Sequence, residues 1–465
     1  MAVPKPTDKS SLSTQRAVLT ITILASFIDP FLGSSVNVAL PTIGRDFAMS
    51  AVLMGWVNTA FLLAAATFSI PFGRLGDIYG RKRIYMTGVI ILMIASALIP
   101  ISNSSGTFIS LRVLQGFGMS MSFATRLAML MSVFPANQRG RVLGINVTAV
   151  YLGLSAGPFL GGIITQHLGW RFLFWIYIPI GIIMLILIFL LIKGDWTDDK
   201  THKFDLTGSI IFGVSLASMM YGFSRLPQPH AAVMTVFGIL GIIGFICYES
   251  RVKEPVVDIG MFRNNTTFAF SNLAAIINYA ATFAVSFIMS IYLQKVRGFS
   301  PQTAGLIMVS QPIVMAIFSP FAGRLSDRIQ PRTVASVGMA MALIGLILLF
   351  FISTTTPLSY IIGCFAFLGL GFALFSSPNT NAIMSSVERR YYGVAGATVG
   401  TMRQIGMMFS MGIIMMILAL HLGQAQVEPE NIDAFMNSAK TGFAVFAALC
   451  FAGIFASLAR GKIQR

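Results

Sequence analysis

Long, uninterrupted apolar runs alternate along this chain with short polar segments that carry most of its charge. A helix crosses a bilayer with about 20 apolar residues, and fourteen runs are of this kind. Because the runs are continuous, without apolar–polar alternation, they predict helices and exclude a transmembrane β-barrel. The runs are 17–40, 51–73, 84–101, 107–134, 142–166, 170–192, 206–224, 231–248, 267–293, 302–322, 333–352, 358–386, 393–422 and 441–459. The pattern predicts an all-α polytopic membrane protein with about 14 transmembrane helices.

The basic residues between the runs predict the orientation of the chain. With the N-terminus inside, 23 of the 32 Lys and Arg residues fall in cytoplasmic segments, six fall outside and three lie within runs. Cytoplasmic loops carry such an excess of positive charge, so we expect both termini to be cytoplasmic. The count fits twelve spans as well as fourteen, because removing 206–224 and 231–248 leaves every other loop on its side.

Composition and charge narrow the class of protein further. Of the 465 residues, 55% are hydrophobic and 10% are charged, whereas a soluble domain has about 25% charged residues. The net charge of +16 would suggest nucleic acid in a soluble protein, but here it follows from topology, so we expect a lipid bilayer and no nucleic acid as partner. The three Cys and four His residues lack metal-ligand spacing, and no phosphate-binding loop occurs. We therefore expect no metal, no cofactor and no ATP hydrolysis.

Two short motifs occur twice in the chain. GRLGD at 73–77 returns as GRLSD at 323–327, and the Gly-Phe-Gly at 116–118 returns as Gly-Leu-Gly at 369–371. Spacings of 250 and 253 residues predict a parallel repeat of two six-helix bundles, a recurring plan of secondary transporters. The predicted parts are a cytoplasmic tail (1–16), an N-terminal bundle (17–192), a central linker with two inserted spans (193–266), and a C-terminal bundle with a short tail (267–465).

The repeated GRLxD segments are predicted to be cytoplasmic loops. Glycine permits a tight exit from a helix, and an aspartate there can bond backbone N–H groups or pair with an arginine. The segments are interpreted as a clamp that holds helices in one conformation; the alternative is an anchor at the anionic inner leaflet. The clamp residues are Gly73, Arg74, Asp77, Arg81, Gly323, Arg324 and Asp327.

One acidic residue, Asp29, lies within a run, about twelve residues into the first span. An ionisable group at that depth costs at least about 2.5–3.5 kcal/mol, which favours a functional role or a buried partner. We interpret Asp29 as a residue that exchanges protons during transport. The alternative is an ion pair between Asp29 and an arginine that only stabilises the bundle.

Three arginines lie within runs: Arg112, Arg126 and Arg403. Arg112 and Arg126 are about 40° apart around one helix, so one face carries both. Arg112 is expected to line the cavity and to assist proton coupling, or else to donate hydrogen bonds in helix packing. With Asp29 as the one buried acid, the cavity has excess positive charge, which makes an anionic or zwitterionic amphiphile an alternative to a cationic substrate.

Small residues form a stripe in the run 142–166. Gly153, Gly157 and Gly161 recur every fourth residue, Pro158 adds a kink and Gly162 broadens the stripe. Small residues let membrane helices approach closely. The stripe is predicted to let another helix pack closely against this run.

Uncharged polar side chains also interrupt the runs. Such groups either line a cavity, where they make sparse polar contacts with a substrate, or hydrogen-bond neighbouring helices. The cavity and substrate candidates, taken with Arg126 and Arg403, are Gln115, Asn37, Asn58 and Gln311.

Several of these segments resemble motifs of the major facilitator superfamily, and the chain is most similar to its fourteen-span drug:proton antiporter branch. The resemblance implies two six-helix bundles that rock around a central cavity, and export of amphiphilic compounds in exchange for protons. It also implies that the stripe of Gly153, Gly157, Pro158, Gly161 and Gly162 packs against the opposite bundle, with ordinary close packing as the alternative. In one respect the chain departs from the branch, because the usual first-span acidic position is occupied by Leu32 and the acid is Asp29, about one turn earlier. The motifs are GRLGDIYGRKR (73–83), RVLQGFG (112–118), GLSAGPFLGG (153–162), WRFLFWIYIPIG (170–181), YLQKVRGFSPQTAGL (292–306) and RQIG (403–406).

Together these features predict a proton-coupled exporter of amphiphilic small molecules in the plasma membrane, acting as a monomer. The same fold also suits an uptake carrier for a small organic solute, which the stripe at 153–162 disfavours. A membrane-embedded enzyme or sensor would need a buried cluster of nucleophiles, bases or metal ligands. The sequence has no such cluster, so we do not expect an enzyme.

Overall fold

The computed structural model describes residues 12–192, 194–196, 205–252, 259–388, 392–423 and 425–461. All regular elements within these residues are helical. Three short segments have other helical geometry: η1 (Ile99–Ile101) and η4 (Pro429–Asn431) are 3-10 helices, and η2 (Tyr292–Val296) is a π-helix. The α-helices are α1 (Leu12–Asp46), α2 (Ala51–Tyr79), α3 (Arg81–Leu98), α4 (Ser105–Val133), α5 (Ala136–His167), α6 (Arg171–Trp175), α7 (Tyr177–Leu191), α8 (Leu206–Arg225), α9 (Pro229–Glu249), α10 (Ile259–Asn264), α11 (Thr266–Ile291), α12 (Pro301–Met308), α13 (Ser310–Arg328), α14 (Pro331–Phe350), α15 (Leu358–Ser385), α16 (Tyr392–Leu422) and α17 (Ile432–Ala459).

Thirteen helical segments among the described residues are long and apolar enough to cross a membrane. The expected number of fourteen is therefore not confirmed. The difference is α4, a helix of 29 residues that fills the predicted run 107–134 but is absent from the thirteen. Its two arginines and Gln115 lower its mean hydropathy. It still packs along both α2 and α3 within the helix assembly, which gives these polar groups protein surroundings.

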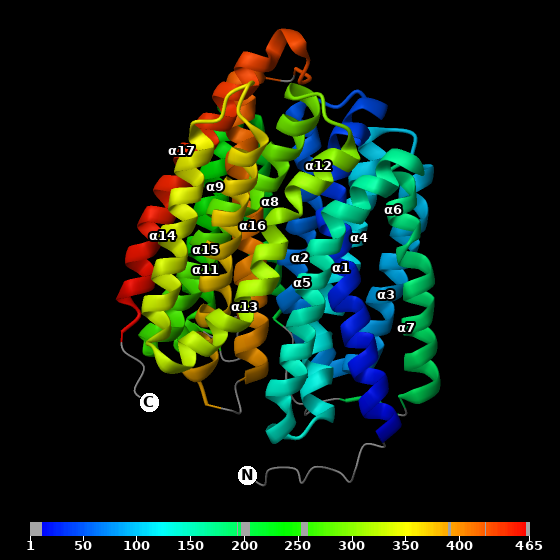
Figure 1. The fold of residues 1–465 in the computed structure, drawn as a ribbon. Helices are drawn as coiled ribbons and strands as arrows, with labels where there is room; N and C mark the ends of the chain where they lie inside the picture. The colour runs from blue at the N-terminus through cyan, green and yellow to red at the C-terminus, as the bar shows by residue number, and fades with distance from the viewer. Residues whose placement is uncertain are drawn as a thin grey trace.

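Contacts divide the long helices into two groups, with one helix pair attached to both (Figure 1). The first group is α1–α7 and the second is α11–α17. Helices α8 and α9 pack on each other, and α8 also contacts α2 of the first group and α16 of the second. The start of α1 and the end of α17 lie at the same end of the assembly (Figure 1); we call this the inner end and the opposite one the outer end. The surface between the two groups is called the seam.

Polar residues in the gaps start the helices. The Ser50 hydroxyl accepts a hydrogen bond from the Leu53 N–H at 3.2 Å, and the Asp205 carboxylate accepts one from the Gly208 N–H at 2.9 Å. Such caps satisfy N–H groups that have no partner within the helix. These caps place the starts of α2 and α8 at Ala51 and Leu206, where the predicted apolar runs also begin.

The two GRLxD segments are not loops, contrary to the sequence-based prediction. Residues 73–77 form the last turns of α2, and the chain turns at Gly80, whose φ is +111°. Residues 323–327 likewise lie inside α13. Their charged side chains are compatible with helix, so the helices continue past the apolar runs. The glycine that permits the turn is Gly80, not Gly73.

The small-residue stripe of α5 faces two directions. A Cβ atom at Gly153, Gly157 or Gly161 would come within 3.0 Å of α1, which belongs to the same group. For these three residues the predicted packing against the opposite group is wrong, because the repeat of four keeps them on the α1-facing side. Gly162 does face the opposite group, since its Cβ would lie 2.6 Å from the carbonyl oxygen of Pro301.

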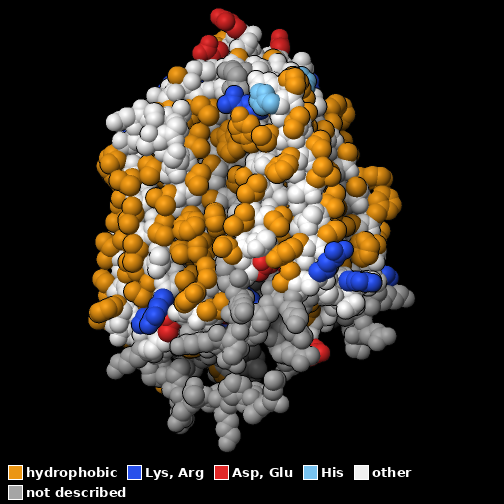
Figure 2. All heavy atoms as spheres, turned by 180° about the vertical axis from the view of Figure 1, so that it is seen from behind, with side chains coloured by type: hydrophobic (Ala, Val, Ile, Leu, Met, Phe, Trp, Pro, Cys, Tyr) orange, Lys and Arg blue, Asp and Glu red, His pale blue; other side chains and the backbone are white. Residues whose placement is uncertain are grey.

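The outer surface has an apolar middle and charged ends. Figure 2 shows hydrophobic side chains covering the middle of one face, while the charged side chains that it colours gather toward its two ends. Helix α9 is typical of this surface, with Val233 and Leu240 exposed by 67% and 61%. Exposed apolar area of this extent is stable next to lipid acyl chains.

Candidate functional site

A buried ion pair joins α1 to α4. Arg126 Nη1 donates to Asp29 Oδ2 at 2.8 Å, and the two side chains are 9% and 7% exposed. The guanidinium also lies 5.6 Å from the centre of the Phe123 ring. Sequence reasoning left the partner of Asp29 open, and in this fold it is Arg126. The pair neutralises two charges that would each be costly alone in a low-dielectric interior.

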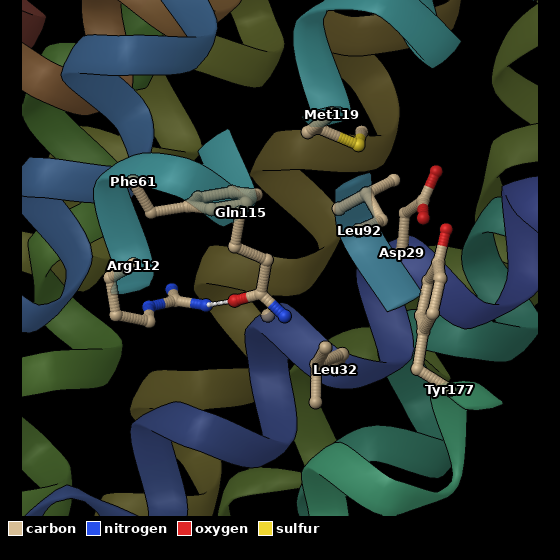
Figure 3. Close-up of a pocket in the computed structure, with 9 residues that line it drawn as sticks. Asp29, Leu32, Phe61, Leu92, Arg112, Gln115, Met119 and Tyr177 are labelled. Carbon is tan, nitrogen blue, oxygen red and sulfur yellow. Dashed lines mark hydrogen bonds between the residues drawn. The ribbon is translucent and has the colours of Figure 1, made fainter. Parts of the chain in front are cut away.

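Asp29 also borders a small cavity within the first group of helices. The cavity is small, with room for about one water molecule, far less than a drug-sized ligand needs. In Figure 3, Arg112 and Gln115 lie on one side of it and Asp29 and Tyr177 on the other. Its walls are mostly apolar, and Asp29, Arg112, Gln115 and Tyr177 supply the polar groups that could bind a water molecule. The lining residues are Asp29, Leu32, Gly33, Phe61, Leu92, Arg112, Gln115, Met119 and Tyr177.

Arg112 is 2% exposed and bonds neutral groups. Its Nε donates to the Val57 carbonyl oxygen at 3.0 Å and its Nη1 to Gln115 Oε1 at 2.5 Å, while its Cζ lies 4.4 Å from the centre of the Phe61 ring. Arg112 therefore both lines the cavity and donates in helix packing, so the two alternatives coexist. Its role in proton coupling stays a prediction.

Two tyrosines near the ion pair were not predicted from the sequence. Tyr177 at the start of α7 borders the cavity, and its hydroxyl points toward the Asp29 carboxylate in Figure 3. Tyr85 of α3 is fully buried, with its hydroxyl 3.6 Å from the sulfur of Met184. A polar hydroxyl inside an apolar run was the available signal, because buried tyrosines usually find a hydrogen-bond partner.

The predicted polar candidates serve different parts of the fold. Asn58 donates from Nδ2 to Asn37 Oδ1 at 2.6 Å, which joins α2 to α1. Gln115 donates from Nε2 to the Ser96 hydroxyl at 2.9 Å, which joins α4 to α3 beside the cavity. Gln311 is half-buried on α13 in the other group. Of these four residues, Gln115 is the one that lines the cavity.

Arg403 lies on α16, in the second group, beside the seam. Its Nη2 donates to the Thr380 hydroxyl of α15 at 2.6 Å, and its Cζ lies 5.6 Å from the centre of the Tyr279 ring of α11. The next residue, Gln404, accepts a hydrogen bond from the Ser69 hydroxyl of α2 at 3.1 Å, across the seam. The fold thus keeps Arg403 apart from the Asp29–Arg126 pair and gives it partners of its own.

Two further charged residues are buried, so Asp29 is not the single buried acid that the sequence predicted. Glu249, the last residue of α9, is 2% exposed. Arg460, directly after α17, is fully buried and donates from Nη1 to Asn379 Oδ1 at 2.8 Å. Burial lowers the pKa of Arg460 to about 10, so it stays charged at neutral pH. Both residues flank apolar runs, where sequence alone predicts solvated loop ends.

Two of the predicted clamp residues, Arg81 and Asp77, form contacts within the first group at the inner end. Arg81 bonds Asp77 at 2.8 Å and the Ser132 hydroxyl at 2.8 Å, which ties the start of α3 to the ends of α2 and α4. Arg74 is half-buried and Arg324 is exposed. The side chain of Asp327 lies outside the described part of the chain. Whether these residues act as a clamp stays a prediction.

An additional residue, Asp195, supports this corner. Its carboxylate accepts hydrogen bonds from the Lys82 N–H at 2.8 Å and the Arg83 N–H at 3.3 Å, at the start of α3. The carbonyl of Trp196 accepts from the Arg81 N–H at 3.1 Å. The segment after α7 therefore caps α3 next to the clamp residues. Nothing in the local sequence around Asp195 indicates a partner about 110 residues away.

Asp195→Ala is expected to destabilise the protein by about 1 kcal/mol, the usual cost of a lost N-terminal cap. The reason is that two N–H groups of α3 lose their acceptor. The measurement is the thermal unfolding midpoint in detergent, which should fall. Glu430→Ala is the matched control, because it removes the same charge from an exposed position in η4. An equal midpoint for both variants would contradict the capping role.

The sequence of this chain is similar to those of known transport proteins. The sequence profile of the Major Facilitator Superfamily matches residues 22–249 and 271–462. The riboflavin transporter RibZ of Clostridioides difficile is 31% identical over 445 residues, which cover 94% of this chain and 95% of that protein. The multidrug resistance protein Stp of Mycobacterium tuberculosis is 29% identical over 422 residues, with 90% and 78% covered.

Solved structures share the fold at low sequence identity. A D-xylose–proton symporter superposes with a TM-score of 0.67 at 14% identity, covering 97% of this chain and 98% of the other. A bacterial homolog of the human lysosomal transporter Spinster, inward-facing and unoccupied, gives 0.66 at 17% identity, with 97% and 98% covered. At these identities the likeness extends to the fold alone.

Proposed function

The chain belongs to the Major Facilitator Superfamily, and from this membership we propose that it is a proton-coupled transporter that exports amphiphilic small molecules by alternating access. It is a multi-pass membrane transporter. The observation that carries the proton-coupled part is the Asp29–Arg126 ion pair, enclosed among membrane helices beside a small cavity. The multidrug resistance protein among its relatives supports the efflux part.

The proposed arrangement is that of two six-helix bundles related by a parallel repeat, over residues 17–192 and 267–465. Residues 1–16 form a cytoplasmic tail, and the linker 193–266 carries the inserted pair α8 and α9. Helix α4 is the fourteenth span, stabilised by its contacts with α2 and α3. Both termini are cytoplasmic, and the monomer is the working unit.

The proposed proton carrier is Asp29. When Asp29 is charged, Arg126 is held at 2.8 Å and α1 is tied to α4. Protonation removes the negative charge and weakens this tie, so the two protonation states favour different helix arrangements. The adjoining cavity has room for about one water molecule, which gives the proton a route to and from Asp29. The Tyr177 hydroxyl and the Arg112–Gln115 pair line the same cavity and are in place to hold that water.

Closure of the outer end is supported by hydrogen bonds across the seam. Gln294 of η2 donates to the Val38 carbonyl oxygen at 2.7 Å, and Gln302 donates from its backbone N–H to Gln166 Oε1 at 3.2 Å. His167 and the Gln302 side chain approach to 3.1 Å. These hydrogen bonds are few, so they can break and re-form when the two helix groups move during a transport cycle.

A second candidate function is uptake of a small organic solute. The observation that favours it is the 31% identity with a riboflavin transporter over nearly the full length of both chains. In that case, protons and substrate would move in the same direction. The two candidates differ in whether substrate moves with the imposed proton flux or against it.

Transport in proteoliposomes distinguishes these functions. A gradient of one pH unit supplies about 1.4 kcal/mol per proton, enough for about tenfold accumulation of substrate. With the inner end of the protein facing outward and the lumen acidic, export by antiport accumulates amphiphilic dyes inside the vesicles. Dissipating the gradient with a protonophore should abolish accumulation. Transport that is indifferent to the gradient would contradict proton coupling, and accumulation only with an alkaline lumen would favour the uptake function.

A further inference from the structure

We infer that Arg403, Thr380 and Tyr279 form a binding site for the acidic group of a planar aromatic substrate. The inference rests on the proposed transport function and adds a substrate class to it. The three residues come from three helices of the second group, α16, α15 and α11, and meet beside the seam.

The guanidinium of Arg403 is held in one orientation by a short chain of hydrogen bonds. Its Nη2 donates to the Thr380 hydroxyl at 2.6 Å, and that hydroxyl donates to the Ser376 carbonyl oxygen at 2.8 Å. The Thr380 oxygen therefore acts as the acceptor for Arg403. A guanidinium has five N–H donors in a planar fork, and this bond uses one of them.

No ion pair neutralises the charge of Arg403 among the residues that the structure describes. Arg126 is compensated by Asp29. Arg112 is 2% exposed and enclosed by Val57, Gln115 and Phe61. Arg403, by contrast, is half-buried, so it combines a positive charge with donors that a ligand can reach.

The neighbours of Arg403 on α16 place it next to the first group. Gln404 is bonded to Ser69 of α2, and Gly400, one turn before Arg403, packs against the Phe123 ring of α4. Phe123 in turn lies under the Arg126 guanidinium. A ligand on Arg403 is therefore close to the helices that carry the proposed proton carrier, at the surface where the two groups separate.

The surroundings select an aromatic anion. A guanidinium fork matches a carboxylate with two parallel hydrogen bonds. Tyr279 provides an aromatic ring beside it. This ring is 5% exposed and is flanked by the Arg403 guanidinium and, edge-on at 5.2 Å, by the Phe372 ring, so a flat aromatic ligand reaches it when the two helix groups separate. An amine would meet the like charge of Arg403 in a low-dielectric setting.

The inference is tested by equilibrium binding to the full-length protein in lipid nanodiscs, with three fluorescent probes of one shape. These are anthracene-9-carboxylate, anthracene-9-carboxamide and 9-anthracenylmethylammonium, which differ in charge. The wild type is expected to bind the carboxylate about tenfold more tightly than the ammonium, the usual strength of a charge-assisted hydrogen bond. Equal or tighter binding of the ammonium, or no binding of any probe, would overturn the inference.

Variants separate recognition of the acidic group from support of the fold. Arg403→Gln should weaken binding of the carboxylate about tenfold and change binding of the amide by less than about twofold. Thr380→Val keeps the charge and removes the orienting acceptor, so the loss should be smaller and again confined to the carboxylate. Equal weakening of all three probes in both variants would show that Arg403 only supports packing, and would overturn the inference.

Arg225→Gln is the matched control. Arg225 also lies over a tyrosine, with its Cζ 6.0 Å from the centre of the Tyr221 ring, but it is exposed at the end of α8. This variant should bind all three probes as the wild type does. Since binding needs no proton gradient, charge selectivity without gradient-driven transport would reject the proposed function and retain this site. Gradient-driven transport without charge selectivity would do the reverse.

Discussion

Asp29→Asn is expected to abolish transport driven by a pH gradient and to lower the stability of the protein. Asparagine has the shape of aspartate but exchanges no proton in this pH range. It also leaves the Arg126 guanidinium, now 2.8 Å from a carboxylate oxygen, buried without a counter-charge. Breaking a buried ion pair in this way costs about 3–5 kcal/mol. The measurements are gradient-driven accumulation in proteoliposomes and the thermal midpoint in detergent.

The double variant Asp29→Asn with Arg126→Gln distinguishes a proton carrier from a structural pair. Removing both charges also removes the uncompensated cation, and a neutral pair of similar size often restores stability. A proton carrier predicts that the double variant recovers the thermal midpoint and stays uncoupled from the pH gradient. Recovery of both properties would contradict the role of Asp29 and leave the pair a purely structural feature.

Arg126→Gln alone is the informative third member of this series. It leaves Asp29 buried without its cation, so the carboxyl group should stay protonated at neutral pH. A carboxyl group that does not release its proton cannot complete the cycle, so coupling should fail although Asp29 is present. Normal coupling in this variant would show that the ion pair is not needed for proton exchange.

Gly305→Leu is expected to keep the outer end of the seam from closing. Gly305 of α12 packs directly against the Pro158 carbonyl oxygen of α5, where a Cβ has no room. Inserting a side chain into such a contact costs about 3 kcal/mol at the upper end of the usual range, which shifts the closed-to-open ratio about 100-fold. Transport should fall to a similar extent, while the folded yield changes little because each helix group stays intact.

The measurement is the accessibility of a cysteine at Ser290, after Cys247, Cys364 and Cys450 have been replaced. Ser290 is fully buried on α11 and accepts a hydrogen bond from Gln294 at 3.1 Å. Gly305→Leu should expose it to a membrane-impermeant maleimide added from the outer side. Unchanged labelling together with normal transport would contradict a closing contact at this position.

Two glycines provide controls for this experiment. At Gly363 of α15 a Cβ meets nothing within 4 Å, so Gly363→Leu should leave both labelling and transport unchanged. At Gly157 a Cβ would meet α1 of the same group. Gly157→Leu should therefore reduce the folded yield, without selective exposure of the cysteine at Ser290.

The sequence by itself determined which segments are buried in lipid and which residue types break that pattern. Apolar length decides whether a helix can cross a bilayer. The predicted run 267–293 therefore matches α11 to within two residues at each end, and the run 17–40 lies inside the longer α1. The charge of Asp29 is costly in any fold that spans the membrane there. That argument needs no coordinates, and the buried carboxylate on α1 follows from it.

Only the tertiary structure decided which groups meet. Arg112 and Arg126 share one face of α4, yet Arg126 binds Asp29 and Arg112 binds Gln115 and Val57. The choice depends on how α1 and α2 cross α4, and helical periodicity does not contain that information. The same holds for Asp195, which caps a helix more than 100 residues earlier in the chain.

The glycine stripe of α5 shows the same division. Its spacing determined that a helix approaches closely, because small residues every four positions lie on one side. Which helix approaches depends on the rotation of α5 within the assembly, and the fold directs Gly157 to α1 and Gly162 to α12. Sequence periodicity records the properties of one helix surface, whereas its partner is set by the packing of all the helices together.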